Sequence, residues 1–290
     1  MHQQFEEYLQ AIENTLAGYL KVPCEPGRVL EAMGYSAFAG GKRIRPILTL
    51  EFTRLCGGDW KAALPFAAGV EMVQTYSLIH DDLPCMDDDD LRRGRPSCHI
   101  AYGEATALLA GDGLLTMAFE AVADAKLPPE RVVRAVGILA GGIGVQGMIG
   151  GQEMDLENEG AISLPLETVR RTNEKKTAAL LSSACRMGVA AAGGTEEQFS
   201  AADRFARNFG LAFQVIDDIL DLTADAEQLG KPVGSDLANE KVTYPSILGL
   251  EGAREYARRY TEEAVDALSI FAENNGILTE YVRRLLDRIN

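Results

Sequence analysis

Positive charge is scarce in this chain of 290 residues, which has 28 lysines and arginines against 43 aspartates and glutamates. The formal net charge of −15 argues against sequence-independent binding to nucleic acid or to anionic membranes, which needs a basic field. The five cysteines are odd in number and form no CxxC pair, so neither a disulfide framework nor a zinc site is favoured. The acidic N-terminus lacks an apolar signal core, and no run reaches 18 apolar residues. We therefore expect a soluble cytoplasmic protein without stable membrane association.

Helical spacing of apolar residues is present instead. The first segment has a single stripe of residues three or four apart, typical of an amphipathic helix: Phe5, Leu9, Ile12, Leu16 and Leu20. Further helices are predicted from Pro46, from Pro65, and over 103–125, 130–150, 166–192, 196–222, 241–250, 252–274 and 278–289. Gly193 and Gly194 end one helix, and Thr195 with Gln198 fits a capping box for the next. Strand-like alternation is rare, so we predict an all-α bundle of about ten or more helices in a single domain over 1–290.

Two clusters of aspartates stand out. The second, Asp217-Asp218-Ile219-Leu220-Asp221, places Asp217 and Asp221 on one helical face about 6 Å apart. Like charges repel there, and Mg²⁺ is the hard cation that binds carboxylates together with phosphate oxygens. The first cluster runs from Asp81 to Asp90, and a straight helix would pair Asp81 with Cys85, which offers no oxygen. A bulge or kink at Pro84 must therefore bring Asp87 round instead.

A solvated acidic surface is the plainer interpretation of either cluster alone. Each cluster, however, follows an apolar run, residues 76–79 and 213–216 respectively, which favours a cavity with an acidic rim. Cations accompany the clusters in the segments GGKRIRP (40–46) and RRGRP (92–96), and at Lys175, Lys176, Lys231 and Lys241. These cations could simply balance neighbouring acids. Carboxylates for a metal and cations for phosphate are explained together by a site that handles a diphosphate.

Seven segments resemble one family, in the family's order between residues 40 and 250. They are GGKRIRP (40–46), SLIHDDLPCMDDDDLRRGRP (77–96), GGQEMDL (150–156), KKTAALL (175–181), FQVIDDILD (213–221), LGKPVGSD (229–236) and EKVTYPSILGL (240–250). The chain resembles the trans-prenyltransferases, or polyprenyl diphosphate synthases, and most closely their bacterial farnesyl diphosphate synthase group. The resemblance implies the isoprenoid synthase fold, with helices around a deep central cavity, and a homodimer.

The resemblance also implies a role for individual residues. It implies that three Mg²⁺ ions are held on the allylic diphosphate by Asp81, Asp82, Asp87, Asp217, Asp218 and Asp221. It assigns isopentenyl diphosphate to Lys42, Arg45 and Arg93, and the allylic diphosphate to Arg92, Lys176, Gln214 and Lys231, with Thr177 near the developing cation. Lys241 belongs to the same set of substrate-binding cations. Gln74 stands where many relatives have a histidine that contacts isopentenyl diphosphate, so this contact is expected to be weaker or differently tuned.

The implied reaction is a Mg²⁺-dependent head-to-tail condensation of isopentenyl diphosphate with dimethylallyl or geranyl diphosphate, giving (2E,6E)-farnesyl diphosphate. Tyr76 lies five residues before Asp81, about 7.5 Å along a helix, where it can act as a floor beside Ser77 for the growing chain. Three alternatives remain: a geranylgeranyl diphosphate synthase, a terpene cyclase and a non-catalytic subunit. A cyclase would not need GGKRIRP, and a non-catalytic subunit is expected to have lost one aspartate cluster. The glycines at 137–151 favour close helix packing over a membrane face, because charged residues flank them.

Overall fold

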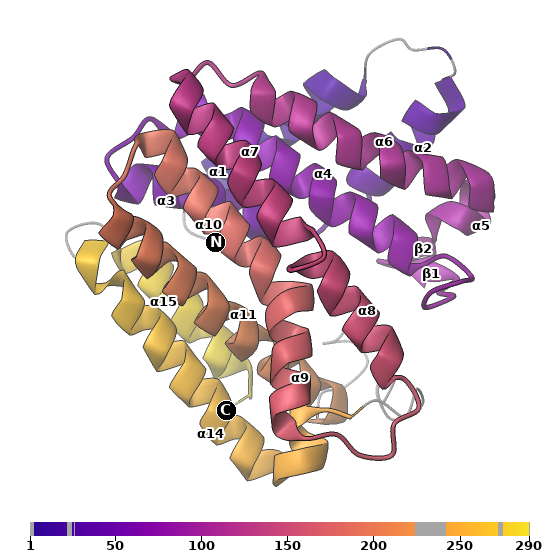
Figure 1. Cartoon of the computed structure of the whole chain (residues 1–290), viewed down its shortest axis with the longest axis vertical. Coiled ribbons are helices and arrows are strands. Elements are labelled where there is room, and N and C mark those ends of the chain that lie inside the picture. Colours follow the sequence, from indigo (N-terminus) through magenta and orange to yellow (C-terminus); the bar gives the residue numbers. More distant parts are fainter. Residues whose placement is uncertain (1–2, 22–24, 26, 224–241, 272–274, 290) are drawn as a thin grey trace. The chain divides into compact units, whose positions relative to one another are not determined.

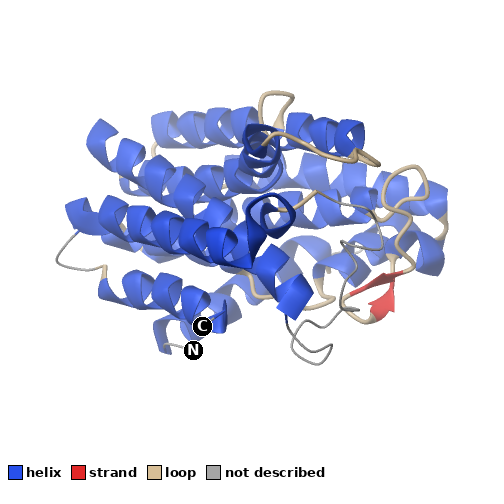
Figure 2. Ribbon diagram, turned by 90° about the horizontal axis from the view of Figure 1, so that it is seen from below, coloured by secondary structure: helices blue, strands red, loops and turns tan. Residues whose placement is uncertain are grey.

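The computed structural model describes residues 3–21, 25, 27–223, 242–271 and 275–289. Nearly all of these residues are helical, which confirms the predicted all-α class (Figures 1 and 2). Two compact units are present: unit 1 comprises residues 1–137 and 190–193, and unit 2 comprises residues 138–189 and 194–290. A single domain over 1–290 stays a prediction.

Unit 1 is built on the pair α4 and α6. Its helices are α1 (Gln3–Leu20), α2 (Gly27–Ala37), α3 (Ile44–Leu55), η1 (Trp60–Ala63), α4 (Leu64–Asp81), α5 (Cys98–Tyr102) and α6 (Glu104–Ala123). The predicted stripe of α1 is buried except for the half-buried Leu9, and Tyr8 is buried beside it. Gly69 lets α4 and α6 approach closely, because a Cβ there would lie 2.8 Å from the carbonyl oxygen of Ala118.

A short hairpin forms the one sheet of the described residues. Strands β1 (Leu91–Arg92) and β2 (Arg95–Pro96) pair antiparallel, and Figure 2 shows them in red among the helices. Both residues of the connecting turn, Arg93 and Gly94, have positive φ, at 54° and 73°. This is the combination that a tight two-residue hairpin turn requires. The hairpin was not predicted, because two-residue strands leave no alternating pattern in the sequence.

Unit 2 is built on the pair α11 and α14. Its elements are α7 (Pro129–Ile143, which begins in unit 1), α8 (Met148–Asn158), α9 (Leu166–Asn173), η2 (Glu174–Ala178), α10 (Ala179–Ala192, which ends in unit 1), α11 (Glu196–Thr223), α14 (Tyr244–Ala267), η3 (Leu268–Phe271), α15 (Gly276–Leu286) and η4 (Asp287–Ile289). The capping box predicted at the start of α11 is confirmed. The Thr195 amide donates to Gln198 Oε1 at 2.9 Å, and the Gln198 amide donates to Thr195 Oγ1 at 3.2 Å.

Of two helix breaks in unit 2, one was not predicted and one was. The helix expected over 130–150 is broken between α7 and α8, where a Cβ at Gly147 would lie 2.0 Å from the carbonyl oxygen of Gly142. The two helices expected over 241–250 and 252–274 are both present within the span of α14, and they meet at a kink at Gly249 (φ 71°, ψ 167°). Residues 241 and 272–274 lie outside the described residues. In both places a glycine permits the change in backbone direction.

Two helical segments are long and apolar enough to cross a membrane, Glu104–Ala123 and Pro129–Asn158. Core helices of soluble proteins have the same length and composition, so this is weak evidence for a membrane span. Some glycines of the second segment have a packing role in unit 2. A Cβ at Gly142 would lie 1.8 Å from Ser183 Oγ of α10.

Candidate active site

The first aspartate cluster begins where α4 ends. The helix does not kink and continue, as we predicted, but ends at Asp81. A closed turn follows, in which the backbone amide of Asp87 donates to the carbonyl oxygen of Asp81 at 2.8 Å. Because Pro84 has no N–H to donate, the chain leaves the helix rather than bending it. The turn still brings the backbones of Asp81 and Asp87 together, as the predicted kink at Pro84 would have done.

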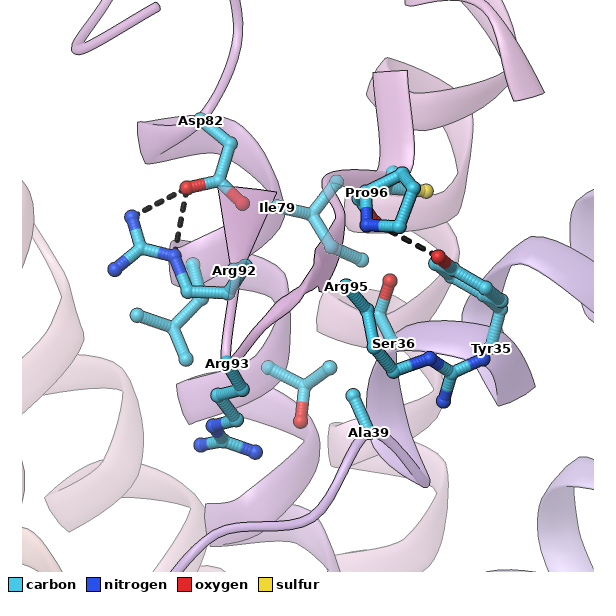
Figure 3. Close-up of a pocket in the computed structure, with 12 residues that line it drawn as sticks. Tyr35, Ser36, Ala39, Ile79, Asp82, Arg92, Arg93, Arg95 and Pro96 are labelled. Carbon is cyan, nitrogen blue, oxygen red and sulfur yellow. Dashed lines mark hydrogen bonds and ion pairs between the residues drawn. The ribbon is translucent and has the colours of Figure 1, made fainter. Parts of the chain in front are cut away.

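Asp82 is tied to an arginine from the hairpin. Its carboxylate is 2% exposed and accepts two hydrogen bonds from Arg92, one of them from Nε at 2.8 Å (Figure 3). Arg92 also donates to Asp89 at 3.1 Å. Burial raises the pKa of Asp82, and the Arg92 charge offsets part of that rise. The hairpin is thereby linked to the end of α4. Asp82 was predicted to bind Mg²⁺ and Arg92 the allylic diphosphate, and here they pair with each other.

The cations of the GGKRIRP segment divide into two groups. Arg43 turns inward and is 4% exposed, whereas Lys42 is exposed and Arg45 is half-buried. The Arg45 Nε is buried and has no hydrogen-bond partner within the described part of the chain. Arg93 folds over the segment: its Nη1 donates to the carbonyl oxygen of Gly40, and its guanidinium lies where a Gly41 side chain would be.

Burial and neighbouring charges lower the pKa of both Arg45 and Arg93. Burial lowers the pKa of Arg45 to about 10, with Glu71 opposing this shift and the Arg93 charge adding to it. Partial desolvation, together with the charges of Arg43 and Arg92, lowers the pKa of Arg93. Burial is the main cause of both lowered pKa values, and an anion bound here would stabilise the charged guanidiniums. Two of the three cations predicted for isopentenyl diphosphate, Arg45 and Arg93, are therefore brought together in unit 1.

Gln74 and Tyr76 lie on different faces of α4. Gln74, Ser77 and Asp81 form a half-buried stripe, and Ser77 Oγ donates to the Gln74 carbonyl oxygen at 3.0 Å. Tyr76 is 5% exposed, and its ring meets the His80 ring edge-on at a centroid distance of 5.6 Å. Burial, and then the Asp81 charge, raises the pKa of Tyr76 to about 12.

His80 places this second face toward α6. The His80 Nε2 lies 3.1 Å from the carbonyl oxygen of Leu108, and a Cβ at Gly111 would lie 2.0 Å from it. Tyr76 therefore shares the α6-facing side of α4 with His80 and Gly69.

A small cavity of about 30 Å³ lies between α2, α4 and the hairpin (Figure 3). Its lining residues are Tyr35, Ser36, Ala39, Thr75, Leu78, Ile79, Asp82, Arg92, Arg93, Arg95, Pro96 and Cys98. The Tyr35 hydroxyl donates to the Pro96 carbonyl oxygen at 2.8 Å and closes one side. The volume suits about one water molecule. The cavity is therefore too small for a prenyl chain.

The second aspartate cluster lies on α11 of unit 2. Asp217 and Asp218 are half-buried, and Asp221 is fully buried. Asp217 and Asp221 share a helical face, as their spacing predicted. Asp218 has a further role, because its Oδ2 accepts from the backbone amide of Tyr244 at 3.1 Å in the first turn of α14.

The residues Lys176 and Thr177 lie in a π-helical turn, η2, between α9 and α10. Neighbouring helices approach this turn at two glycines. A Cβ at Gly151 of α8 would lie 2.1 Å from the Lys176 amide nitrogen, and one at Gly210 of α11 would lie 2.7 Å from the Ala178 Cβ. Such turns are rare and occur frequently at functional sites.

Hydrogen bonds to neighbouring helices fix the side chains of Lys176 and Thr177. Lys176 Nζ donates to Asp155 Oδ2 of α8 at 2.6 Å, and Thr177 Oγ1 donates to Gln214 Oε1 of α11 at 3.0 Å. Three residues predicted for one site, Thr177, Gln214 and Lys176, are thus adjacent in unit 2. Two further predicted residues, Lys231 and Lys241, lie outside the described residues.

Sequence reasoning missed two acids that organise these groups, Glu71 and Asp155. Glu71 is the one charged residue in the apolar run of α4 before His80, a signal that could have identified it. Asp155 lies within GGQEMDL, a segment that carries the family resemblance without a predicted ligand contact of its own. No group of three or more possible metal-ligating side chains of the His, Cys, Asp or Glu type is preassembled among the described residues.

A family model described as polyprenyl synthetase matches residues 26–273. The chain belongs to the polyprenyl synthetase family. Farnesyl diphosphate synthase of Geobacillus stearothermophilus is 45% identical over 289 residues, covering 99% of this chain and 97% of the relative. Geranylgeranyl pyrophosphate synthase of Capsicum annuum is 50% identical over 249 residues, covering 85% of this chain and 68% of the relative.

Solved structures of the family agree in fold. A geranyltransferase from Legionella pneumophila has a TM-score of 0.89 at 34% identity, covering 99% of this chain and 96% of the other. An FPP/GFPP synthase from Zymomonas mobilis has a TM-score of 0.87 at 36% identity, covering 97% of both chains. The isoprenoid synthase fold is confirmed, and this polyprenyl synthetase family member is a prenyltransferase.

Proposed function

We propose that this prenyltransferase condenses isopentenyl diphosphate with dimethylallyl or geranyl diphosphate to give farnesyl diphosphate. The observation that supports a diphosphate substrate is the pair of neighbouring guanidiniums of Arg45 and Arg93. Two such groups favour a bound anion, and the buried Arg45 Nε has no hydrogen-bond partner among the described residues. Similarity over nearly the whole chain to a farnesyl diphosphate synthase supports the product. The bulky, buried Tyr76, five residues before Asp81, supports it as well.

The aspartates fit Mg²⁺ by their chemistry. Asp81 and Asp87 come from one closed turn, and Asp217 and Asp221 from one helical face, so each pair offers hard oxygen donors. Asp82 and Asp218 would complete the sets, each keeping an oxygen beside its present partner. When bound, three Mg²⁺ ions would neutralise charge on the leaving diphosphate.

The chain's own residues bind and orient the substrates. Lys42, Arg45 and Arg93, with Gln74, would hold the diphosphate of isopentenyl diphosphate, which is not released. Arg92, Lys176 and Lys231 would hold the allylic diphosphate, with Lys241 as a further cation. Thr177 and Gln214, already hydrogen-bonded to each other, would direct their oxygen dipoles at the allylic cation. Because no side chain is an evident base, the released diphosphate is proposed to accept the proton.

The second candidate product is geranylgeranyl diphosphate, which the similarity to the Capsicum annuum enzyme favours. We also propose a cytoplasmic homodimer without stable membrane association. Exposed apolar side chains support a protein interface: Leu108 and Leu109 on α6 are 47% and 53% exposed, and Val133 on α7 is 71% exposed.

Labelled isopentenyl diphosphate tests the proposed reaction. The purified chain would be incubated with it and with either dimethylallyl or geranyl diphosphate, and the dephosphorylated products separated by length. A C15 product supports the first proposal, and a C20 product supports the second. A product formed without isopentenyl diphosphate would indicate a cyclase, and no product from either pair would contradict a catalytic role.

Substitutions of different cations are expected to affect the kinetics of the two substrates differently. Arg45→Ala or Lys42→Ala should raise the KM for isopentenyl diphosphate about tenfold or more, because these cations bind a diphosphate that does not leave. Arg92→Ala should instead lower kcat and weaken the allylic substrate, because its attraction grows as the leaving group gains charge. Steady-state kinetics with each substrate varied in turn would measure this. Equal effects of Arg45→Ala on both substrates would contradict the assignment.

Product length is expected to depend on Tyr76. The ring is buried beside His80, five residues before Asp81, so its removal would open space along α4 below the first aspartate cluster. Tyr76→Ala should therefore shift products from C15 to C20 and longer, whereas Tyr76→Phe keeps the ring and should retain C15. Chromatography of dephosphorylated products would measure the shift. An active Tyr76→Ala enzyme that still made only C15 would place the floor at another residue.

A further inference from the structure

Arg43 is the cation of GGKRIRP that the proposed mechanism does not use. Its guanidinium is buried and reaches three elements at once. Nε donates to Glu13 of α1 at 2.8 Å, Nη1 to Glu71 of α4 at 2.5 Å, and Nη2 to the carbonyl oxygen of Ala37, the last residue of α2, at 2.5 Å. The planar fork of arginine suits three acceptors in different directions, which a lysine ammonium cannot serve from the same place.

The backbone conformation of Arg43 explains how its side chain can point inward while those of Lys42 and Arg45 do not. Arg43 is the N-cap of α3 and has a left-handed conformation, with φ 48° and ψ 34°. Few residues other than glycine adopt it, and it persists only where the surroundings hold it. The buried contacts of Arg43 supply that hold. Lys42 precedes this residue and Arg45 follows it, so the direction of both depends on this single backbone conformation.

Glu71 connects the Arg43 anchor to the ligand-facing cations. It is 3% exposed, pairs directly with Arg43, and its negative charge also acts on both Arg45 and Arg93. One buried carboxylate therefore lies within the electrostatic reach of three guanidiniums. Only Arg43 uses it in a direct hydrogen bond among the described contacts. The charges of Arg45 and Arg93 stay available at the surface of this cluster.

We propose that Arg43, held by Glu71 and Glu13, is a positioning residue that sets Lys42 and Arg45 for isopentenyl diphosphate. The inference rests on the proposed function, since it concerns the same substrate. Arg43 does not touch the diphosphate. It fixes the left-handed turn from which the two binding cations extend, so its loss changes affinity for one substrate and leaves the other nearly unaffected.

Arg43→Lys tests the proposal, with Arg54→Lys as a matched control. Arg54 lies on the same helix α3 and donates two hydrogen bonds to the buried Glu51, at 2.9 and 2.7 Å, but has no place in the site. Arg43→Lys should raise the KM for isopentenyl diphosphate about tenfold, with the KM for geranyl diphosphate and kcat within about threefold of the parent. Arg54→Lys should lower the thermal midpoint without changing either KM.

Glu13→Gln provides a milder variant if Arg43→Lys does not fold, since Glu13 is only one of the three acceptors and its side chain is 34% exposed. It should raise the same KM about two- to fivefold. Equal changes in both KM values, or unchanged KM values in a folded Arg43→Lys enzyme, would overturn the positioning role. The proposed function fails separately, if the parent enzyme itself does not consume isopentenyl diphosphate.

Discussion

The Asp217→Ala enzyme is expected to turn over about 10³–10⁵ times more slowly than the parent at saturating substrate and Mg²⁺. In the proposed mechanism Asp217 would contribute oxygen ligands from the face of α11 that it shares with Asp221, and an alanine side chain offers none in their place. Losing part of the charge compensation on a leaving diphosphate costs several kcal/mol in the transition state. Single-turnover measurement of allylic diphosphate consumption would separate this loss from slow product release.

A matched control is available in the same unit. Asp266→Ala removes an exposed aspartate of α14 that has no place in the proposed site, and it should leave kcat within about twofold. Removing divalent cations with a chelator should abolish turnover of the parent, and added Mg²⁺ should restore it. Near-normal turnover of Asp217→Ala in Mg²⁺ would make the second aspartate cluster an ordinary solvated surface.

Gly151→Ala is expected to lower kcat about 10²-fold and to destabilise the protein by about 1–3 kcal/mol. The added Cβ would lie 2.1 Å from the Lys176 amide nitrogen and 2.6 Å from the Lys175 carbonyl carbon, both backbone atoms that cannot turn away. Helix α8 must therefore separate from the π-helical turn η2. Lys176 and Thr177 would then lose the geometry that Asp155 and Gln214 now fix.

Gly141→Ala is the matched control for this substitution. Gly141 is a helical residue of α7, and a Cβ there would meet no atom within 4 Å. Alanine is favoured over glycine in a helix by up to about 1 kcal/mol, so this variant should be as stable as the parent or slightly more stable, with unchanged kcat. Thermal unfolding and steady-state kinetics on both variants would test the pair. An active, stable Gly151→Ala enzyme would show that the close approach of α8 is dispensable.

The helices could be predicted from the sequence wherever a single apolar stripe decides the packing. In α1 the spacing of Phe5, Ile12 and Leu16 was sufficient, because each buried residue lies on the same face. Helix α2 (Gly27–Ala37) was missed, since its buried residues are the small Ala32 and Ala37 with Met33, which leave a weak pattern. The aspartate clusters could be located because paired carboxylates after apolar runs are chemically unusual.

The contacts within the site could not be predicted in the same way. Nothing local distinguishes Arg43 from Lys42 and Arg45, because its inward direction depends on Glu13 and Glu71, which lie 30 and 28 residues away in the chain. The end of α4 at Asp81 depends on a hydrogen bond from Asp87 that closes only once the turn has formed. Periodicity also cannot reveal a π-helical turn, because η2 continues the helix on both sides and is held by glycines of other elements.

Three residues other than glycine have positive φ among the described residues: Arg43, Asp88 and Arg93. All three lie in segments assigned to substrate or metal binding. For a side chain with a Cβ, this conformation costs about 1–2 kcal/mol per residue, which glycine would not incur. The chain thus gives up folding stability at these positions in exchange for placed charges. Laboratory evolution of this enzyme for heat tolerance alone should therefore accumulate glycine or asparagine at the exposed positions 88 and 93. Arg43 should persist, because its loss would leave the buried Glu71 without its partner. Such a selection retains activity only when each round is screened with isopentenyl diphosphate at a limiting concentration.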